Sequence, residues 1–405
     1  MADEPSGAPT PAGASGGGTG ASIPFYRDVR VLAVITQIVF LAIVLLVIGW
    51  LLNNLITNSE TRGISTSLDW FDRRAGFTPS ESVIPYTADD TYARALLVGL
   101  LNTIMVSVVG IFLATIIGLI VGIARLSSNW LVSKVSLAYV EIFRNTPVLV
   151  QLLVIYFVVF LQMPAVRESI RFPLDMYLSQ RGFYMPRPEV APDGAIWLTS
   201  IIIAVVAFGT LWVVAGRREA AGRPTMGLRW IAAAVLIGLP LLVWFLIPGG
   251  PLVFENPELG SFNMSGGLRF SPEFLALTVG LALFTAAFIA EIIRGGIQAV
   301  SKGQLEAART IGLKEGEVLR LVILPQALRI IIPPLTSQYL NLIKNSSLAL
   351  AIGYADIFNI SRTVSEQTGQ PVSVLAIVML VYLIVSLATS VLMNFYNRMV
   401  QIHER

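Results

Sequence analysis

Long apolar stretches constrain the fold of this chain more than any other feature of its sequence. Residues 31–52 contain no charged side chain, and about 20 apolar residues are enough to cross a bilayer as a helix. Charged residues make up only 13% of the chain, roughly half the usual fraction for a soluble domain. The predicted fold class is therefore an all-α polytopic membrane protein with about eight transmembrane helices. The other seven spans are expected at residues 95–124, 137–161, 196–215, 230–247, 273–296, 327–352 and 372–396.

Composition and motifs exclude several classes of function. The chain has no cysteine and a single histidine, His403, so neither a metal site nor histidine-based catalysis is expected. No Gly-x-x-x-x-Gly-Lys-Ser/Thr sequence occurs, which predicts that the chain itself binds no ATP. The net charge of +3 is small and indicates no nucleic-acid partner. We expect a protein of the lipid bilayer that is not an enzyme and has no catalytic residues.

Changes in composition divide the chain into segments. Residues 1–24 are mostly Gly, Ala, Pro, Ser and Thr, which predicts a disordered cytoplasmic tail. Residues 25–94 hold the first transmembrane helix and a polar periplasmic loop. Residues 95–398 form the main transmembrane domain, in which residues 162–272 insert a helical hairpin and periplasmic loops. Lysine and arginine are more numerous on the side of the two termini, so both termini are expected in the cytoplasm.

The segment 301–325 is a charged, amphipathic stretch between two apolar spans. Ser301 and Gln304 have the spacing of a capping box, and Gly312 is placed to end the short helix that follows. A second amphipathic helix is expected from Glu315 to about residue 324, ended by Pro325. The segment is interpreted either as a docking element for another protein or as an amphipathic loop lying on the membrane surface.

Two pairs of charged residues lie within predicted spans. Glu141 with Arg144, and Glu291 with Arg294, share the spacing i, i+3, which lets each acid pair with its base. Charged groups within spans usually face the bundle interior or a water-filled path. Both pairs are therefore candidates for an inner gate or a partner contact, and the alternative is two structural ion pairs. Pro147 lies in the third predicted span, residues 137–161, and is expected to kink that helix.

Polar residues within the spans are candidates for a substrate path. Lys344 could receive a substrate carboxylate, with neighbouring amides and hydroxyls fixing its orientation; the alternative is that Lys344 extends to the membrane interface. Its neighbours in this role are Asn341, Asn345, Ser346 and Ser347. Weaker candidates are Gln151, Asn102, Thr103 and Ser107, since serine and threonine often bond only their own helix.

Two further features have a simple physical interpretation. Gly118 and Gly122 form a Gly-x-x-x-Gly face, which permits close contact between helices.

Asp356 and Glu366, in the outer loop before the last span, could contact a binding protein. The alternative is that both acids are merely solvated.

Several separate motifs resemble one family. Residues Glu306-Ala307-Ala308, then Gly312, then Leu324-Pro325-Gln326-Ala327, resemble the EAA loop of ABC-importer permeases. The flanking sequences at 141–151, 290–297 and 344–348 resemble its polar amino-acid uptake branch, of the general L-amino-acid permease type. The resemblance extends from about Tyr92 to Arg398 and is interrupted by the insertion.

The resemblance implies a fold, a function and partners. It implies a five-helix type I permease core, with three extra helices here, in the bacterial inner membrane. The coupling residues would be those of the EAA loop: Glu306, Ala307, Ala308, Gly312, Leu324 and Pro325. This loop would dock on a cytosolic ABC ATPase dimer, which would bind the ATP and Mg. A second permease subunit, forming a heterodimer, and a periplasmic amino-acid-binding protein would complete an importer of polar L-amino acids.

Two other classes of membrane protein are considered. An ion-coupled secondary amino-acid transporter commonly has inverted repeats with broken helices in matching positions, and the proline-containing spans of this chain have no clear symmetric mates. A non-transporting membrane scaffold would not require polar residues inside its spans. The sequence does not determine which amino acids are carried.

Overall fold

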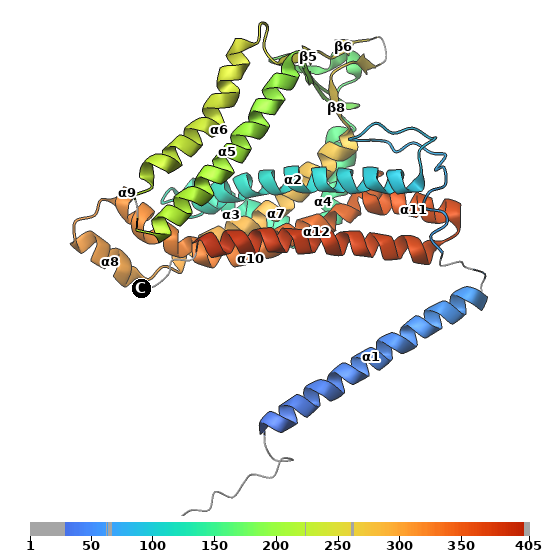
Figure 1. Cartoon of the computed structure of the whole chain (residues 1–405), viewed down its shortest axis with the longest axis horizontal. Helices are drawn as coiled ribbons and strands as arrows, with labels where there is room; N and C mark the ends of the chain where they lie inside the picture. Colours follow the sequence, from blue (N-terminus) through green and yellow to red (C-terminus); the bar gives the residue numbers. More distant parts are fainter. Residues whose placement is uncertain (1–28, 62, 64–66, 223, 261–262, 401–405) are drawn as a thin grey trace, which may run out of the picture. The chain divides into compact units, whose positions relative to one another are not determined.

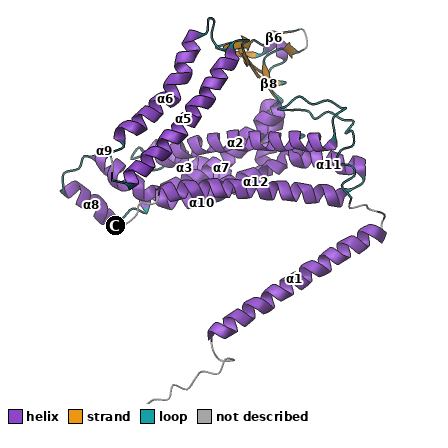
Figure 2. Cartoon of the chain, in the orientation of Figure 1, coloured by secondary structure: helices purple, strands orange, loops and turns teal. Residues whose placement is uncertain are grey.

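The computed structural model describes residues 29–61, 63, 67–222, 224–260 and 263–400 of the chain. The predicted tail at residues 1–24 lies outside the described residues. Most of the described chain is helical, with short strands confined to one region (Figure 2). The chain forms two compact units, Met1–Thr66 and Ser67–Arg405.

The first unit contains one helix, α1 (Val29–Thr61). Its apolar side chains are exposed all round, and none of the best apolar window within residues 32–59 is buried inside the unit. Because lipid is as apolar as these side chains, a helix that is hydrophobic on every face suits a bilayer. The predicted first span is confirmed as a single helix.

The second unit contains the other helices, which include two π-helical and two 3-10 segments. The α-helices are α2 (Tyr92–Ala124), α3 (Trp130–Asn145), α4 (Val148–Val154), α5 (Gly194–Ala220), α6 (Met226–Leu246), α7 (Pro272–Gln298), α8 (Lys302–Thr310), α9 (Glu315–Val318), α10 (Leu324–Asn345), α11 (Ile357–Thr368) and α12 (Pro371–Val400). The π-helical segments are η1 (Ile155–Phe160) and η3 (Leu319–Ile323), and the 3-10 segments are η2 (Val166–Glu168) and η4 (Ser346–Ile352). Among the described residues, seven helices are long and apolar enough to cross a membrane, or eight if a bent pair forms one span.

Helix α7 is the centre of this unit and packs against α2, α3, α4 and α10. The contact with α2 is close at two glycines of that helix. A Cβ atom on Gly118 would lie 2.6 Å from Ile289, and one on Gly122 would lie 2.9 Å from the carbonyl oxygen of Ala290. Only a residue without a side chain fits such a contact, so the predicted Gly-x-x-x-Gly face is confirmed.

The third span differs from its prediction. It is a broken pair, α3 followed by α4 and η1, whose axes differ by 106°. Pro147 has no N–H to donate, and the residue before a proline is kept out of the helical region. Thr146 accordingly has an extended backbone, with φ −102° and ψ 133°. The expected bend at Pro147 is therefore present, but it separates two helices instead of kinking one.

Short antiparallel sheets close the base of the insertion. Strands β1 (Ile170–Phe172), β2 (Met176–Ser179), β3 (Gly182–Met185) and β8 (Leu268–Phe270) form one sheet in that order. Because Phe183 pairs with Phe270, the two ends of the insertion lie side by side. Two smaller pairs are β4 (Arg187–Val190) with β5 (Leu252–Glu255), and β6 (Glu258–Leu259) with β7 (Met264–Ser265). The sequence analysis treats these segments as loops.

Helices α5 and α6 of the insertion form an antiparallel hairpin (Figure 1). The indole N–H of Trp197 donates to the carbonyl oxygen of Pro240 at 3.2 Å, and Trp197 packs edge-on against Trp244. Both helices keep most of their apolar surface exposed, as expected for contact with lipid. The predicted helical hairpin within residues 162–272 is present.

Residues 67–91 pack against the helices. Trp70 is fully buried, donates through its indole N–H to the hydroxyl of Ser373 at 3.0 Å, and packs edge-on against Tyr92. This cluster fixes the segment on the first turn of α2 and on the end where α12 begins. It therefore positions the polar residues that follow in the same segment.

Candidate coupling site

The first half of the 301–325 segment is helix α8. Ser301 precedes it without a side-chain capping bond, so the predicted capping box is wrong there. The helix ends as predicted, because Gly312 has φ +84°, a left-handed conformation that glycine adopts readily. Its N–H donates to the carbonyl oxygen of Arg309 at 3.0 Å, and that of Leu313 donates to Ala308 at 3.2 Å.

The second half does not end at Pro325. Helix α9 begins after Lys314, whose N–H donates to a carboxylate oxygen of Glu317 at 2.8 Å. It continues through η3 into α10, so Pro325 lies in the first turn of α10. A π-helical turn next to a proline accommodates the missing N–H and the bulk of its ring without breaking the helix. The expectation that Pro325 stops the helix is therefore wrong.

Side-chain contacts bridge the two halves of the segment. The guanidinium of Arg309 donates two hydrogen bonds to the carboxylate of Glu315, at 2.9 and 3.2 Å, across the turn at Gly312. The amide of Gln326 donates to that of Gln304, which ties α8 to the start of α10. We call α8, the turn at residues 311–314 and α9 the elbow.

The outer face of the elbow has no packing partner among the described residues of this chain. Glu306 and Ala307 are exposed, and Ile311 is 76% exposed next to the turn. Ala308 and Val318 are buried instead and hold the elbow to the rest of the chain. Exposed acidic and apolar side chains on a short helix and the turn after it suit insertion into a groove of another protein.

A cluster of charges joins α2 to α7 at the same end of the bundle. Glu291 accepts hydrogen bonds from Arg294, which confirms that predicted pair, and also from Arg125 at the end of α2. Arg294 extends further to Gln298. The second span was predicted to end at residue 124, just before Arg125, and no signal in the sequence linked Arg125 to a residue 166 positions away.

The other predicted pair is not formed. Glu141 accepts a hydrogen bond from the amide of Asn145 at 2.9 Å, and both Glu141 and Arg144 are exposed. The guanidinium of Arg144 lies over the ring of Phe288, 5.2 Å from its centre, where a cation is attracted to the π face. Spacing alone predicted the pair, but the ring on α7 offers Arg144 a closer partner.

The candidate substrate residues of α10 lie on different sides of the helix. Lys344 and Asn341 are exposed, Asn345 is half-buried and Ser346 is fully buried. The hydroxyl of Ser346 donates to the carbonyl oxygen of Ile343 at 2.7 Å, and Ser347 donates in the same way to Lys344. The two hydroxyls thus bond their own helix, and the polar groups open to a ligand or a partner are Asn341 and Lys344.

Gln151 has a structural contact at the broken span. Its amide nitrogen donates to the carbonyl oxygens of Phe143 and Thr146, at 2.8 and 2.9 Å. These carbonyls lie at the end of α3 and have lost their helical partners at the break. Gln151 therefore caps α3, while its own carbonyl oxygen is buried without a hydrogen-bond partner among the described residues.

The polar residues of α2 hold α11 in place. The amide of Asn102 donates to the carbonyl oxygen of Ala355 at 2.8 Å, and the hydroxyl of Thr103 accepts from the N–H of Ile357 at 3.0 Å. Asp356 between them is fully buried and caps α11 by accepting from the N–H of Asn359 at 2.8 Å. Both interpretations of Asp356 as an accessible loop acid are therefore wrong. Ser107 donates to its own helix, as the alternative interpretation expected.

Burial also changes the titration of Asp356. Loss of water around the carboxylate raises its pKa to about 6, against the hydrogen bonds that favour its charged form. The hydroxyl of Tyr382 on α12 lies 3.4 Å from the second oxygen. Asp356 is thus buried where α2, α11 and α12 meet, and its carboxylate bonds to α11 and α12.

Comparison with known proteins identifies the class to which this fold and elbow belong. Residues 228–402 match the family described as binding-protein-dependent transport system inner membrane component. The chain is 45% identical over 379 residues to the general L-amino acid transport system permease protein AapQ of Rhizobium johnstonii, covering 93% of this chain and 94% of that one. It is 38% identical over 412 residues to the glutamate/glutamine/aspartate/asparagine transport system permease protein BztB of Rhodobacter capsulatus, covering 93% and 96%.

The chain therefore belongs to this family of ABC-importer permeases, as the motifs of the sequence predicted. It is a multi-span membrane permease, and the alternative of an ion-coupled secondary transporter is wrong. A solved structure titled as an amino acid ABC transporter with histidines is also similar, with a TM-score of 0.45 and 22% identity, covering 76% of this chain and 94% of that one.

Proposed function

We propose that this chain is the permease subunit of an ATP-driven, binding-protein-dependent importer of polar L-amino acids in the bacterial inner membrane. The observation that carries the proposal is the elbow, which displays Glu306, Ala307 and Ile311 outward while Arg309 and Glu315 pair across its turn. The relatives support the substrate class, since AapQ and BztB are named as amino-acid transport permeases. The bias of basic residues supports a cytoplasmic elbow and cytoplasmic termini.

In this proposal the elbow receives motion from a cytosolic ATPase dimer that binds the ATP and Mg. Because α9, η3 and α10 are continuous and Gln304 is bonded to Gln326, a push on α8 moves the inner part of α10. Helix α10 packs on α7 and α12, so the motion reaches the whole bundle. Such rigid-body coupling would switch the pathway between inward-facing and outward-facing states.

The same proposal places a second permease subunit against the exposed face of α10. A lysine facing hydrocarbon is costly, yet Lys344 and Asn341 are exposed on this helix. A second permease subunit lying against them, forming a heterodimer, would convert this face into the wall of a polar pathway. Glu141 and Arg144, exposed near the end of α3, would line the inner gate, and a periplasmic binding protein would deliver the amino acid to the opposite end.

The elbow can be tested in the complete transporter reconstituted in liposomes with its binding protein and ATPase. Gly312→Pro should abolish ATP-driven uptake, because proline cannot adopt φ +84° and removes the N–H that donates to Arg309. Gly209→Ala in α5 is the control outside the elbow: a Cβ there meets no atom within 4 Å, and uptake should remain normal. Glu306→Lys should also abolish uptake without changing the amount of protein in the membrane. Normal uptake by both Gly312→Pro and Glu306→Lys would refute the docking role.

A further inference from the structure

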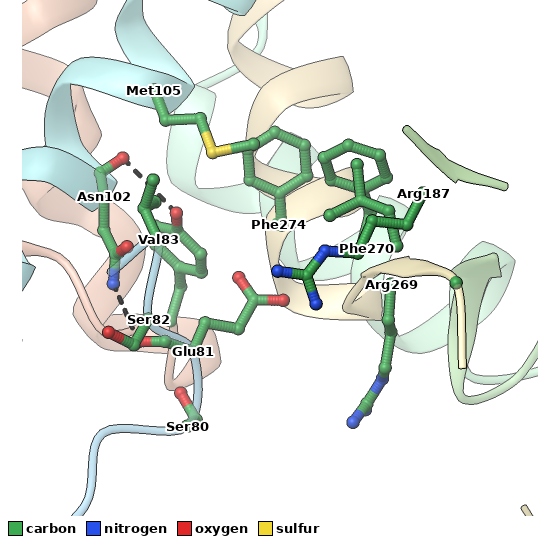
Figure 3. A pocket seen from close by; sticks show the side chains of 13 residues that line it. Ser80, Glu81, Ser82, Val83, Asn102, Met105, Arg187, Arg269, Phe270 and Phe274 are labelled. Carbon is green, nitrogen blue, oxygen red and sulfur yellow. Dashed lines mark hydrogen bonds between the residues drawn. The ribbon is translucent and has the colours of Figure 1, made fainter. Parts of the chain in front are cut away.

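A cavity of about 340 Å³ lies at the end of the bundle opposite the elbow. Its walls come from residues 80–83, from the first half of α2, from strand β8 and from the start of α7 (Figure 3). Helix α7 has 27 residues and so spans about 40 Å, which separates the cavity from the elbow at its other end. Of its lining residues, the sequence analysis named Asn102 as a weaker candidate for a substrate path. Its volume is in the range of small-molecule sites, roughly 300–1,000 Å³.

Glu81 supplies a buried acid to the cavity. One carboxylate oxygen accepts a hydrogen bond from the N–H of Ser271 at 2.7 Å, at the start of α7. Burial raises the pKa of Glu81, in opposition to the bonds from Ser271. The side chain of Ser271 also bonds this carboxylate. In Figure 3 the carboxylate extends into the space, beside Asn102.

Asn102 supplies an acceptor that lacks a donor. Its side chain is 1% exposed and lines the inner wall of the cavity. The amide nitrogen donates to the carbonyl oxygens of Glu81 and Ala355, at 3.0 and 2.8 Å. The amide oxygen is buried and has no partner among the described residues. An acceptor left in this state costs about 1–3 kcal/mol, so a donor arriving through the cavity would be stabilised there.

Arg187 supplies the opposite charge from strand β4. In Figure 3 its side chain extends into the space, whereas Arg269 points away from it and donates to the carbonyl oxygen of Arg181 at 3.1 Å. The only ion pair of Arg187 within the described residues is with its exposed neighbour Glu189, at 3.8 Å. A pair of this kind is weak, so the guanidinium is available to an anion. Met105, Phe270, Phe274 and Tyr354 complete an apolar wall.

We propose that this cavity is a binding site for a free L-α-amino acid, at the end of the permease where a solute would enter. The ammonium group lies between the carboxylate of Glu81 and the amide oxygen of Asn102, and the α-carboxylate binds Arg187. The side chain of the ligand packs against Phe270 and Phe274, which stack with centres 5.1 Å apart. The inference rests on the proposed function, and deepens it by placing a recognition site for the zwitterion outside the candidate path along α10.

The test measures equilibrium binding of tritiated L-glutamine to the complete permease–ATPase complex in nanodiscs without the binding protein. L-Glutamine is chosen because its side chain is uncharged. Any effect of removing a charge from the cavity then reports on the ammonium or the α-carboxylate group of the ligand. Glu81→Gln and Arg187→Gln should each weaken binding at least tenfold. The matched controls are Glu258→Gln on β6 and Arg171→Gln on β1, both exposed and outside the cavity, and they should bind like the unaltered complex.

Two analogues assign the charges. Glutaramate, which lacks the ammonium, should compete equally poorly in the unaltered complex and in Glu81→Gln. L-Glutaminamide, which lacks the carboxylate, should not distinguish the unaltered complex from Arg187→Gln. Since Glu81 also holds the start of α7, Arg187→Gln on its exposed strand is the variant that retains the fold. Unchanged affinity in Arg187→Gln, or no L-glutamine binding by the unaltered complex, would overturn the site.

Failure of the site and failure of the proposed function give different results. If the unaltered transporter imports amino acids with ATP, while the cavity variants bind L-glutamine normally, only the cavity assignment is lost. If the transporter with all its partners imports no amino acid under ATP hydrolysis, the proposed function itself is wrong.

Discussion

Two helix pairs in this protein are similar in sequence and different in packing. Helices α2 and α7 and helices α5 and α6 are both long, apolar and rich in small residues. Yet 67% of the apolar window of α7 is buried, against 17% in α5 and 6% in α6. A Cβ on Gly118 of α2 would collide with Ile289, whereas one on Gly209 of α5 or Gly238 of α6 would meet no atom within 4 Å.

The difference shows what holds a helix pair together in lipid. Burial of apolar surface does not favour contact between helices in a bilayer, so close packing and polar contacts decide. Helices α2 and α7 have both, through their glycine contacts and the bonds between Arg125 and Glu291. Helices α5 and α6 are joined by Trp197 and Trp244 and by an exposed ion pair, Glu219 with Arg229. Only the first pair combines close glycine contacts with a largely buried ion pair.

The largest expected effect comes from Gly118→Val. The added side chain would force α2 away from Ile289, and overpacking of this kind costs about 1–3 kcal/mol or more. We expect loss of ATP-driven uptake and a lower melting temperature in detergent. Gly209→Val and Gly238→Val are the matched controls and should retain both. If either hairpin variant lost transport as completely, the hairpin would be as closely engaged in the complex as α2 is with α7, and the comparison would fail.

A smaller effect on stability, dependent on pH, is expected at Asp356, which lies next to the residues that bond to α2. Its pKa is about 6 in the folded protein and 3.8 ordinarily, so between pH 4 and 6 the folded state binds more protons than the unfolded chain. The free energy of unfolding should therefore fall as pH rises through this window, by about 2–3 kcal/mol, and stay level above it. Asp356→Asn keeps an acceptor for the N–H of Asn359 and removes the charge.

The measurement is the melting temperature of both proteins in detergent from pH 4 to pH 7. The advantage of Asp356→Asn over the unaltered protein should grow as pH rises to about 6 and then remain constant. A difference that does not change with pH would contradict the assignment. The hairpin has no buried carboxylate among its described residues, so this dependence belongs to the α2 side alone.

Much of the fold follows from sequence because membrane spans are local features. The apolar runs, the Gly118 and Gly122 face and the turn at Gly312 each depend on residues close together in the chain. Prolines were harder to interpret. Pro147 breaks a span and Pro325 does not, because the outcome depends on whether the neighbouring turns can widen and on what satisfies the freed carbonyls.

The site was predictable only where its residues share one segment. The elbow is continuous in sequence, and so its helix, glycine turn and second helix were found. The cavity combines Glu81, Asn102 and Arg187, which no periodicity relates. Asp356 seemed a loop acid because the segment around it is polar, but the packing of α11 on α2 buries it. Arg144 shows the converse, since a partner on another helix replaced the one that spacing favoured.

The smallest expected effect compares the two ion pairs directly. In Glu291→Gln, Arg125 and Arg294 lose the charge that they share, and their side chains are only 15% and 28% exposed. Leaving such groups without a charged partner costs about 1–2 kcal/mol, which a denaturation midpoint in detergent would detect. In Glu219→Gln, the pair is 56% and 43% exposed, so the change should be within about 0.5 kcal/mol. Uptake should fall severalfold in the first variant and stay normal in the second. Equal losses in both would mean that the charges at the end of α2 and α7 only add stability, and that the close glycine contact alone transmits motion between these helices.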